Sequence, residues 1–237
     1  MKRIFPFFLL CLVGLYGCID NSKNHEAIPP LPQLSSSAKD QGTPASNPEN
    51  WIMAHVDVET TGLVPGYHQM IDLGLVMTDL KGDVVDSLFI RIQPSHPERT
   101  SDGARRVNGY DEATWEKLGA IKASQAVDSL RLFHDRVAQG RKVVMTSFNS
   151  HFDAAFLDHL FREANQSWRE LYHYFILDIP SMAWSLGYQD FMLRGLMEER
   201  EIEDEPHVAD QHTGITGAMK NVRIYKELMK IQEESVN

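Results

Sequence analysis

Two acidic residues, Asp57 and Glu59, lie at the end of an otherwise apolar segment that begins at Trp51. Residues 51–58 read Trp-Ile-Met-Ala-His-Val-Asp-Val, a pattern typical of a buried strand. Residues two apart on a strand point to the same face, so the two carboxylates would lie side by side. Their repulsion and desolvation are costly unless cations are near. The pair therefore predicts a site for two divalent metal ions, with oxygen ligands suited to Mg²⁺ or Mn²⁺. The alternative is an edge strand whose two acids are solvated.

The composition is that of an ordinary soluble globular protein, with 43% hydrophobic and 24% charged residues among 237. This length fits one domain with extensions. The net charge of −10 argues against a protein that coats long nucleic acid electrostatically. It does not exclude an enzyme that holds a few nucleotides through metal ions and local contacts.

The first 18 residues have the layout of a lipoprotein-type signal peptide: a basic start, an apolar stretch over 4–17, and then Cys18. A lipidated Cys18 would anchor an exported chain to a membrane, on its periplasmic or cell-surface side. Residues 19–50 contain five prolines and five serines, which predicts a disordered tether before a folded domain over 51–237. The alternatives are an uncleaved N-terminal anchor and translation from Met53 in the cytoplasm. Both cysteines, Cys11 and Cys18, precede the domain, which therefore has no disulfide, thiolate metal site or cysteine nucleophile.

The order of elements predicts an α/β domain with a mixed sheet flanked by helices. Strands are expected at 51–58, 71–78 and 84–92, and their short connections favour an antiparallel arrangement. Helices and strands then alternate. The remaining helices are expected at 111–118, 123–138, 153–164, 180–186, 191–200 and 217–231, and the remaining strands at 143–148 and 174–177.

A second constellation leaves the strand at 143–148 and opens a helix at Asp153. An acid at a helix start satisfies unpaired amides and the macrodipole, so capping alone would explain Asp153. Asn149 and the two phenylalanines on either side of Asp153, Phe152 and Phe156, indicate more than a cap.

Three segments, in this order, resemble motifs of the DEDD-type 3′–5′ exonucleases. They are residues 57–62 together with 71–74, residues 106–110, and residues 149–157. The similarity spans roughly residues 52–231 and resembles most the ribonuclease T and proofreading branch, which carries a catalytic histidine (DEDDh). It implies a ribonuclease H-like fold, two-metal hydrolysis of nucleic acid from 3′ ends, and a possible homodimer.

The resemblance also implies roles for the acids. Asp57 would bridge both metal ions, Glu59 would bind the one that activates water, and Asp153 would act mostly through bound water. A histidine would take the proton of the nucleophile.

The terminal nucleotide would, by the same resemblance, lie against Thr60, Leu63 and Phe156. Asn108 and Asn149 belong to the segments that border this pocket. For Leu63 and Phe156 ordinary core packing is the alternative. The motifs do not tell DNA from RNA, because contacts to the 2′-hydroxyl decide that.

The family's third motif is a histidine followed five residues later by an aspartate at the start of the final helix, and two frames fit it. In one, His207 is the histidine and His212 takes the place of the aspartate. In the other, His212 is the histidine and Gly217 takes that place. The second frame is favoured, because the first puts Gly214 and Gly217 inside the helix. His212 is then the expected base.

In that frame the fourth carboxylate is missing, because Gly217 has no side chain. Three hypotheses follow: a weakened exonuclease, an exonuclease with a relocated ligand such as Asp210, or a nucleotide-binding lipoprotein that has lost catalysis. The acids over 198–205 are expected to be a solvated helix end and loop.

Overall fold

The computed structural model describes residues 42–209 and 211–236 of the chain. The predicted signal peptide with Cys18, most of the predicted tether, and Asp210 lie outside the described residues. The described part begins with a turn in which Ser46 N donates to Thr43 O, and a 3₁₀ helix, η1 (Pro48–Asn50), leads into the first strand. Regular structure thus starts upstream of Trp51. Within the described residues, no helix combines the length and apolarity that crossing a membrane requires.

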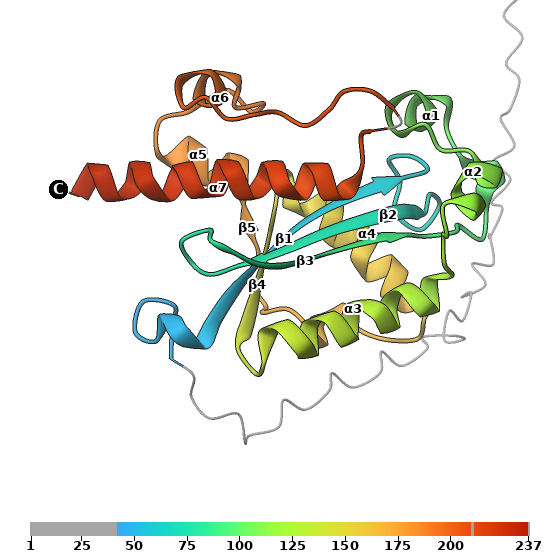
Figure 1. The fold of residues 1–237 in the computed structure, drawn as a ribbon, viewed down its shortest axis with the longest axis horizontal. Helices are drawn as coiled ribbons and strands as arrows, with labels where there is room; N and C mark the ends of the chain where they lie inside the picture. The colour runs from blue at the N-terminus through green and yellow to red at the C-terminus, as the bar shows by residue number, and fades with distance from the viewer. Residues whose placement is uncertain (1–41, 210, 237) are drawn as a thin grey trace, which may run out of the picture. The chain divides into compact units, whose positions relative to one another are not determined.

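In the described chain five strands form one mixed sheet with the order β3-β2-β1-β4-β5 (Figure 1). The strands are β1 (Trp51–Thr60), β2 (Met70–Thr78), β3 (Val84–Arg91), β4 (Lys142–Ser147) and β5 (Leu177–Asp178). The first three pair antiparallel, whereas β4 pairs parallel to β1 and β5 parallel to β4. The predicted α/β class and the mixed sheet are confirmed. The last strand is shorter than expected and lies later in the chain.

The helices follow the predicted order with one addition. They are α1 (Asp102–Asn108), α2 (Glu112–Lys117), α3 (Ala123–Ala138), α4 (Ser150–Glu163), α5 (Ile179–Ser185), α6 (Arg194–Glu199) and α7 (Gly214–Val236), with short 3₁₀ turns η2 (Pro97–Arg99) and η3 (Trp168–Glu170). The sequence did not predict α1. Both α4 and α7 begin three residues earlier than predicted, and this shift matters for the site.

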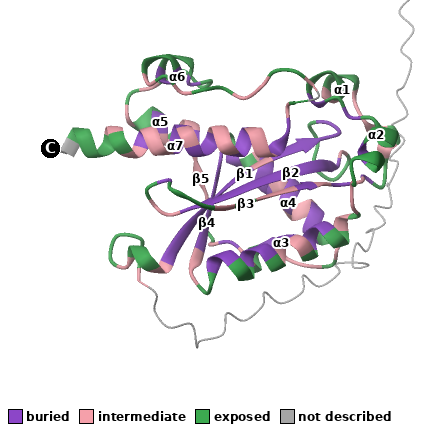
Figure 2. Ribbon diagram, in the orientation of Figure 1, coloured by how far each residue is buried: buried purple, intermediate pink, exposed green. Residues whose placement is uncertain are grey.

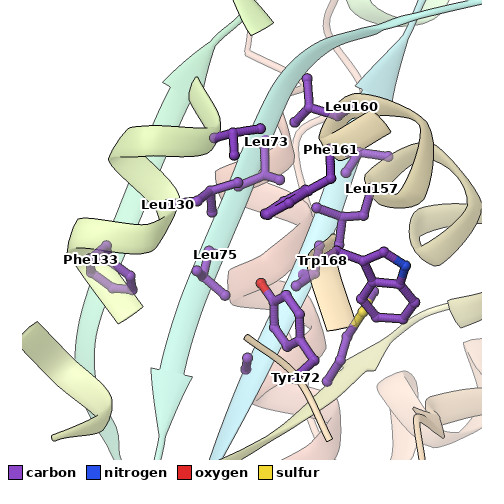
Figure 3. Packing of buried hydrophobic residues seen from close by; sticks show 14 of the residues in the cluster. Leu73, Leu75, Leu130, Phe133, Leu157, Leu160, Phe161, Trp168 and Tyr172 are labelled. Atoms are coloured by element: carbon purple, nitrogen blue, oxygen red, sulfur yellow. The ribbon is translucent and has the colours of Figure 1, made fainter. Parts of the chain in front are cut away.

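Alternating residues of β1 face two different helix layers. Ile52, Ala54, Val56 and Val58 enter the main core, which is built with side chains of α3 and α4 (Figure 3). The opposite face, with Trp51 and Met53, packs against Tyr225 of α7. Helices on both faces explain why every residue of β2 is buried (Figure 2). By this alternation Asp57 and Glu59 share the α7 face of β1, as the spacing of the two acids predicts.

The first turn of α7 lies directly on the backbone of β1 and β2 because three positions have no side chain. A Cβ on Gly74 would overlap the backbone of Gly214, and a Cβ on Gly214 would lie 2.6 Å from the carbonyl oxygen of Asp57. Gly214 N donates to the Asp72 carboxylate at 2.9 Å, which fixes the start of the helix. The sheet and α7 therefore bring Gly217 against the acidic end of β1.

Candidate active site

A cavity of about 450 Å³ lies at the C-terminal end of β1, bordered by α1, α4 and the segment that precedes α7. Among its lining residues in the described chain are four acids and one histidine: Asp57, Glu59, Asp153, Glu205 and His212. No lysine or arginine of the described residues lines it. The cavity therefore gathers acidic side chains, and the cations of the described residues that contact them are His212, at Glu59 and Glu205, and Lys220, from behind the lining, at Glu205.

Burial and mutual repulsion shift the pKa of two of these acids. The pKa of Asp57 is raised well above its usual value, first by burial and then by the charges of Asp153, Glu59 and Glu205. Burial likewise raises the pKa of Asp153, which is 2% exposed. A cation that binds between the two carboxyls would displace their protons and offset the repulsion that raises the pKa values.

Asp153 lies in the first turn of α4 rather than at its cap. The helix begins at Ser150, and the backbone N–H of Ser150 donates to Asp178 Oδ1 at 2.9 Å. Asn149, at the N-cap position, has a left-handed backbone (φ 66°) and makes no side-chain cap bond. The Asp153 carboxylate accepts from the backbone N–H groups of Asp153 and Val58, so it satisfies an amide of the first turn, as the capping explanation expects. The same residue also lines the cavity.

Glu59 is held at both oxygens. Asn108 Nδ2 donates to Oε2 at 3.2 Å and also to the carbonyl oxygen of Thr60 at 3.0 Å. His212 Nε2 lies 3.1 Å from Oε1. Asn108 thus fixes Glu59 relative to the end of β1, a role that the sequence did not reveal.

Of the two candidate histidines, the structure places His212 against the acids. Its Nδ1 faces the carbonyl oxygen of Pro206 at 3.2 Å and Glu205 Oε2 at 3.4 Å. The hydrogen bond to Glu59, reinforced by the charges of Glu59 and Glu205, raises the pKa of His212 to about 9. The side chain of His207 is 71% exposed and pairs with Asp204.

The register argument that favoured His212 does not hold, although its result agrees with these contacts. Gly214 and Gly217 both lie inside α7, because the helix begins at Gly214. The glycines are tolerated there because they allow the close approach to the sheet.

Position 217 points at the acids. A Cβ built on Gly217 would lie 2.5 Å from Asp57 Cγ. Any side chain here would therefore enter the space of the Asp57 carboxylate. Gly217, which has no side chain, therefore lies directly against the carboxylate cluster.

Glu205 is the site residue that the sequence analysis missed. It was expected to belong to a solvated run of acids, and its neighbours Glu203 and Asp204 are indeed exposed. The side chain of Glu205 is only 13% exposed, and its Oε1 pairs with Lys220 Nζ of α7 at 3.2 Å. The sequence carried no signal for this burial, because the fold of the loop before α7 decides which acid of the run turns inward.

The residues predicted to bind the terminal nucleotide divide into two groups. Thr60, Leu63 and Asn108 line the cavity. Leu63 is 79% exposed, so core packing does not explain it. Phe156 does not line the cavity, because it is buried in the main core.

Phe152, one helical turn before Phe156, takes the position at the cavity. Its ring contacts that of Phe156 at a centroid distance of 4.8 Å.

Asn149 lines a second cavity, of about 700 Å³. Phe148 lines both cavities, so they adjoin. The second one carries Trp184 and Phe191, whose rings stack with centroids 5.3 Å apart and an interplanar angle of 21°. Both rings are largely exposed. The pair is an aromatic surface next to the acidic cavity.

The chemistry of the donor set fits hard divalent cations. Carboxylate oxygens and one imidazole face the cavity, and the described domain offers no thiolate. No three His, Cys, Asp or Glu side chains of the described residues are already arranged around one point as metal ligands. Binding a cation therefore requires side-chain rotation, above all at Glu59, where His212 takes one oxygen.

Comparison with solved structures gives the same fold. Escherichia coli exonuclease I in complex with a dT13 oligonucleotide has a TM-score of 0.63 and 13% identity, covering 78% of this chain and 42% of that chain. The zinc-bound form of the complex of exonuclease I with single-stranded DNA has a TM-score of 0.62 and 16% identity, covering 77% and 41%. The chain thus spans less than half the length of exonuclease I.

A second protein is matched along nearly its whole length. The nuclease domain of 3′hExo, a DEDDh family member bound to rAMP, has a TM-score of 0.61 and 14% identity, covering 76% of this chain and 92% of that domain. No curated protein matches the sequence. The family model of the RNase T exonucleases matches residues 55–225, most of the chain. The chain therefore belongs to the RNase T exonuclease family and has the ribonuclease H-like fold of the DEDDh exonucleases.

Proposed function

We propose that the chain is a metal-dependent 3′–5′ exonuclease that releases nucleotides one at a time from short or single-stranded DNA or RNA. The observation that supports it most is the cavity at the end of β1, which is lined by several carboxylates and by His212. Family membership and the fold support the same reaction class.

Asp57, Glu59 and Asp153 would hold Mg²⁺ or Mn²⁺. Such ions, when bound, acidify a water molecule and neutralise charge on the phosphodiester. His212 Nε2 accepts a proton from the water molecule while the oxygen of that water molecule bonds to phosphorus. The bond from phosphorus to the 3′ oxygen of the shortened strand breaks, and that oxygen takes up a proton. The products are a shortened strand with a 3′-hydroxyl and a nucleoside 5′-monophosphate.

The shape of the site suits one terminal nucleotide with a short strand behind it. Leu63 and Phe152 offer apolar surface to the terminal base and sugar in the acidic cavity. Trp184 and Phe191 offer a stacking surface to the preceding bases in the adjoining cavity. The net charge of −10 favours such local contacts over the binding of a long strand.

The test is an oligonucleotide labelled at its 5′ end and incubated with the protein and Mn²⁺ or Mg²⁺. We expect a ladder of products that shorten from the 3′ end, which disappears with chelator or in Asp57→Asn. DNA and RNA substrates of equal sequence decide the sugar preference. An intact oligonucleotide in every condition contradicts the proposal.

A second candidate is a nucleic-acid-binding protein without turnover. The observation that favours it is the missing carboxylate at Gly217, beside Asp57. Fluorescence anisotropy separates the two candidates. A pure binder retains a labelled oligonucleotide in the presence of Mn²⁺ and leaves it intact.

We also propose that the chain is exported and anchored through a lipid on Cys18. This rests on the order of basic, apolar and cysteine residues over 1–18. Radiolabelled palmitate should be incorporated by the wild-type chain and not by Cys18→Ala. Equal labelling of both chains contradicts the anchor.

A further inference from the structure

We propose that Glu205 supplies the metal-binding carboxylate that Gly217 lacks. The inference rests on the proposed function in one respect, namely that the cavity binds divalent cations. It assigns a ligand that lies twelve residues before position 217, outside the motif by which the family is recognised.

The surroundings of Gly217 show why a ligand cannot come from that position. Gly217 lies against the Asp57 carboxylate, and a Cβ there would already lie 2.5 Å from Asp57 Cγ. Gly217 supplies no carboxylate, and the place where its Cβ would lie is taken by the Asp57 carboxylate. A replacement ligand must therefore come from another segment that reaches the cavity. Glu205 lines the same cavity as Asp57, and its charge contributes to the raised pKa of Asp57. Glu205 is therefore close enough to Asp57 to interact with its carboxyl electrostatically.

One oxygen of Glu205 accepts no hydrogen bond from the described residues. Glu205 Oε2 is inaccessible to solvent and has no hydrogen-bond partner within the described chain. Its nearest charged neighbour is His212 Nδ1, at 3.4 Å, and the carbonyl oxygen of Pro206 is closer to that nitrogen. The ion pair with His212 at 3.4 Å leaves this buried oxygen without a hydrogen bond from any described residue, which is costly for a carboxylate. A divalent cation in the cavity would satisfy it.

A lysine of α7 holds Glu205 in place. Lys220 Nζ lies 3.2 Å from Glu205 Oε1 and 2.6 Å from Asp204 Oδ1, and the lysine side chain is only 11% exposed. Lys220 follows Gly217 by three residues, so both lie on one face of α7. The helix thus contributes a lysine that holds Glu205 Oε1, whereas Oε2 accepts no hydrogen bond within the described chain.

A competing role for Glu205 is to orient His212 without touching a metal ion. The two roles differ in what a neutral side chain does. If Glu205 only orients His212, Glu205→Gln changes the pH profile of the histidine and leaves cation affinity unchanged. If Glu205 is a ligand, the same substitution lowers cation affinity directly.

The experiment titrates the full chain with Mn²⁺ and follows free Mn²⁺ by electron paramagnetic resonance, in the absence of nucleic acid. We expect Glu205→Gln to weaken binding by about 10- to 100-fold or more. Glu203→Gln removes an equal charge from an exposed position two residues away and should bind like wild type. Far-UV circular dichroism checks that each variant is folded.

A rescue variant makes the test independent of any structural damage. Glu205→Asp keeps a carboxylate at position 205, where Glu205→Gln has an amide, and leaves the Asp57 side chain in place. A higher Mn²⁺ affinity in Glu205→Asp than in Glu205→Gln supports the role of the Glu205 carboxylate as a ligand. Equal affinity of wild type and Glu205→Gln overturns it, and so does a wild-type chain that binds no Mn²⁺.

Failure of this inference and failure of the proposed function give different results. A wild-type chain that shortens oligonucleotides while Glu205→Gln binds Mn²⁺ normally refutes only the role of Glu205. A chain that binds Mn²⁺ through Glu205 but leaves every oligonucleotide intact refutes the exonuclease.

Discussion

His212 Nε2 lies 3.1 Å from Glu59 Oε1, so the expected base of the reaction and an expected metal ligand share one contact. The imidazolium and a divalent cation compete for the same carboxylate. The pKa of His212 is raised to about 9 by Glu59, so the ring is protonated at about pH 8 while this contact persists. A cation on Glu59 removes the cause of the shift, and the histidine then loses its proton.

Cation binding should therefore release a proton from His212. Isothermal titration calorimetry with Mn²⁺ at about pH 8, in two buffers of different ionisation enthalpy, counts the protons released. We expect His212→Gln to release up to one proton fewer than wild type. The carboxyls with raised pKa, Asp57 and Asp153, contribute equally in both proteins. His96→Gln, at an exposed position outside the cavity, should match wild type. An unchanged count in His212→Gln contradicts the pairing.

Asn108→Ala should weaken cation binding without unfolding the domain. Asn108 holds both Glu59 Oε2 and the carbonyl oxygen of Thr60, so its loss leaves the Glu59 carboxylate free to rotate. Loss of such an orienting partner typically costs about 10- to 100-fold in metal affinity. The measurement is the same Mn²⁺ titration.

Asn221→Ala is the matched control for Asn108→Ala. Asn221 is also buried and donates to the Val56 carbonyl oxygen at 3.0 Å, and it does not line the acidic cavity. We expect it to lower the free energy of unfolding by about 1–3 kcal/mol and to leave Mn²⁺ affinity unchanged. Equal loss of affinity in both variants would show that Asn108 acts through stability alone.

Trp184→Ala should impair the use of longer substrates selectively. Its ring stacks with Phe191 on the second cavity, beyond the position of the terminal nucleotide. Stacking of a base on an aromatic ring contributes about 1–3 kcal/mol, so KM for a single-stranded oligonucleotide should rise roughly tenfold. Hydrolysis of a dinucleotide should change little. Tyr174→Ala removes another exposed ring, outside both cavities, and should behave like wild type. A similar effect of both variants contradicts a stacking site.

The sequence was sufficient for the sheet and for the acids because both depend on local patterns. Alternation along β1 predicts that Asp57 and Glu59 share a face, and the structure puts both at one cavity. The two interleaved sets of apolar residues on β1 predict cover on both faces.

The helix α1 was missed although its ends carry signals. Ser101 Oγ accepts from the Ala104 N–H, and Gly109 ends the helix with a φ of 68°. Only Asn108 of this helix is buried, so there is no apolar stripe to detect.

The remaining site residues depend on distant contacts that no local pattern encodes. Glu205 and its exposed neighbour Asp204 are alike in sequence, and both reach Lys220. What separates them is that the loop before α7 turns Glu205 toward the cavity. Similarly, Phe152 and Phe156 lie on successive turns of α4, and only packing against the main core decides which of them reaches the cavity.

Acid should destabilise the fold in part through His134. This histidine is buried in the main core layer, its Nε2 lies 3.0 Å from the Tyr172 hydroxyl, and burial lowers its pKa to about 4 from an ordinary 6.5. Below pH 6.5 the unfolded chain binds a proton that the folded one refuses, so stability falls by up to about 1.4 kcal/mol per pH unit until about pH 4. The raised pKa values of the buried acids act in the opposite direction, so wild type must be compared with His134→Gln by urea unfolding across this range. We expect a flatter decline in the variant, whose amide can still bond Tyr172, and parallel curves would show that His134 does not titrate in this way.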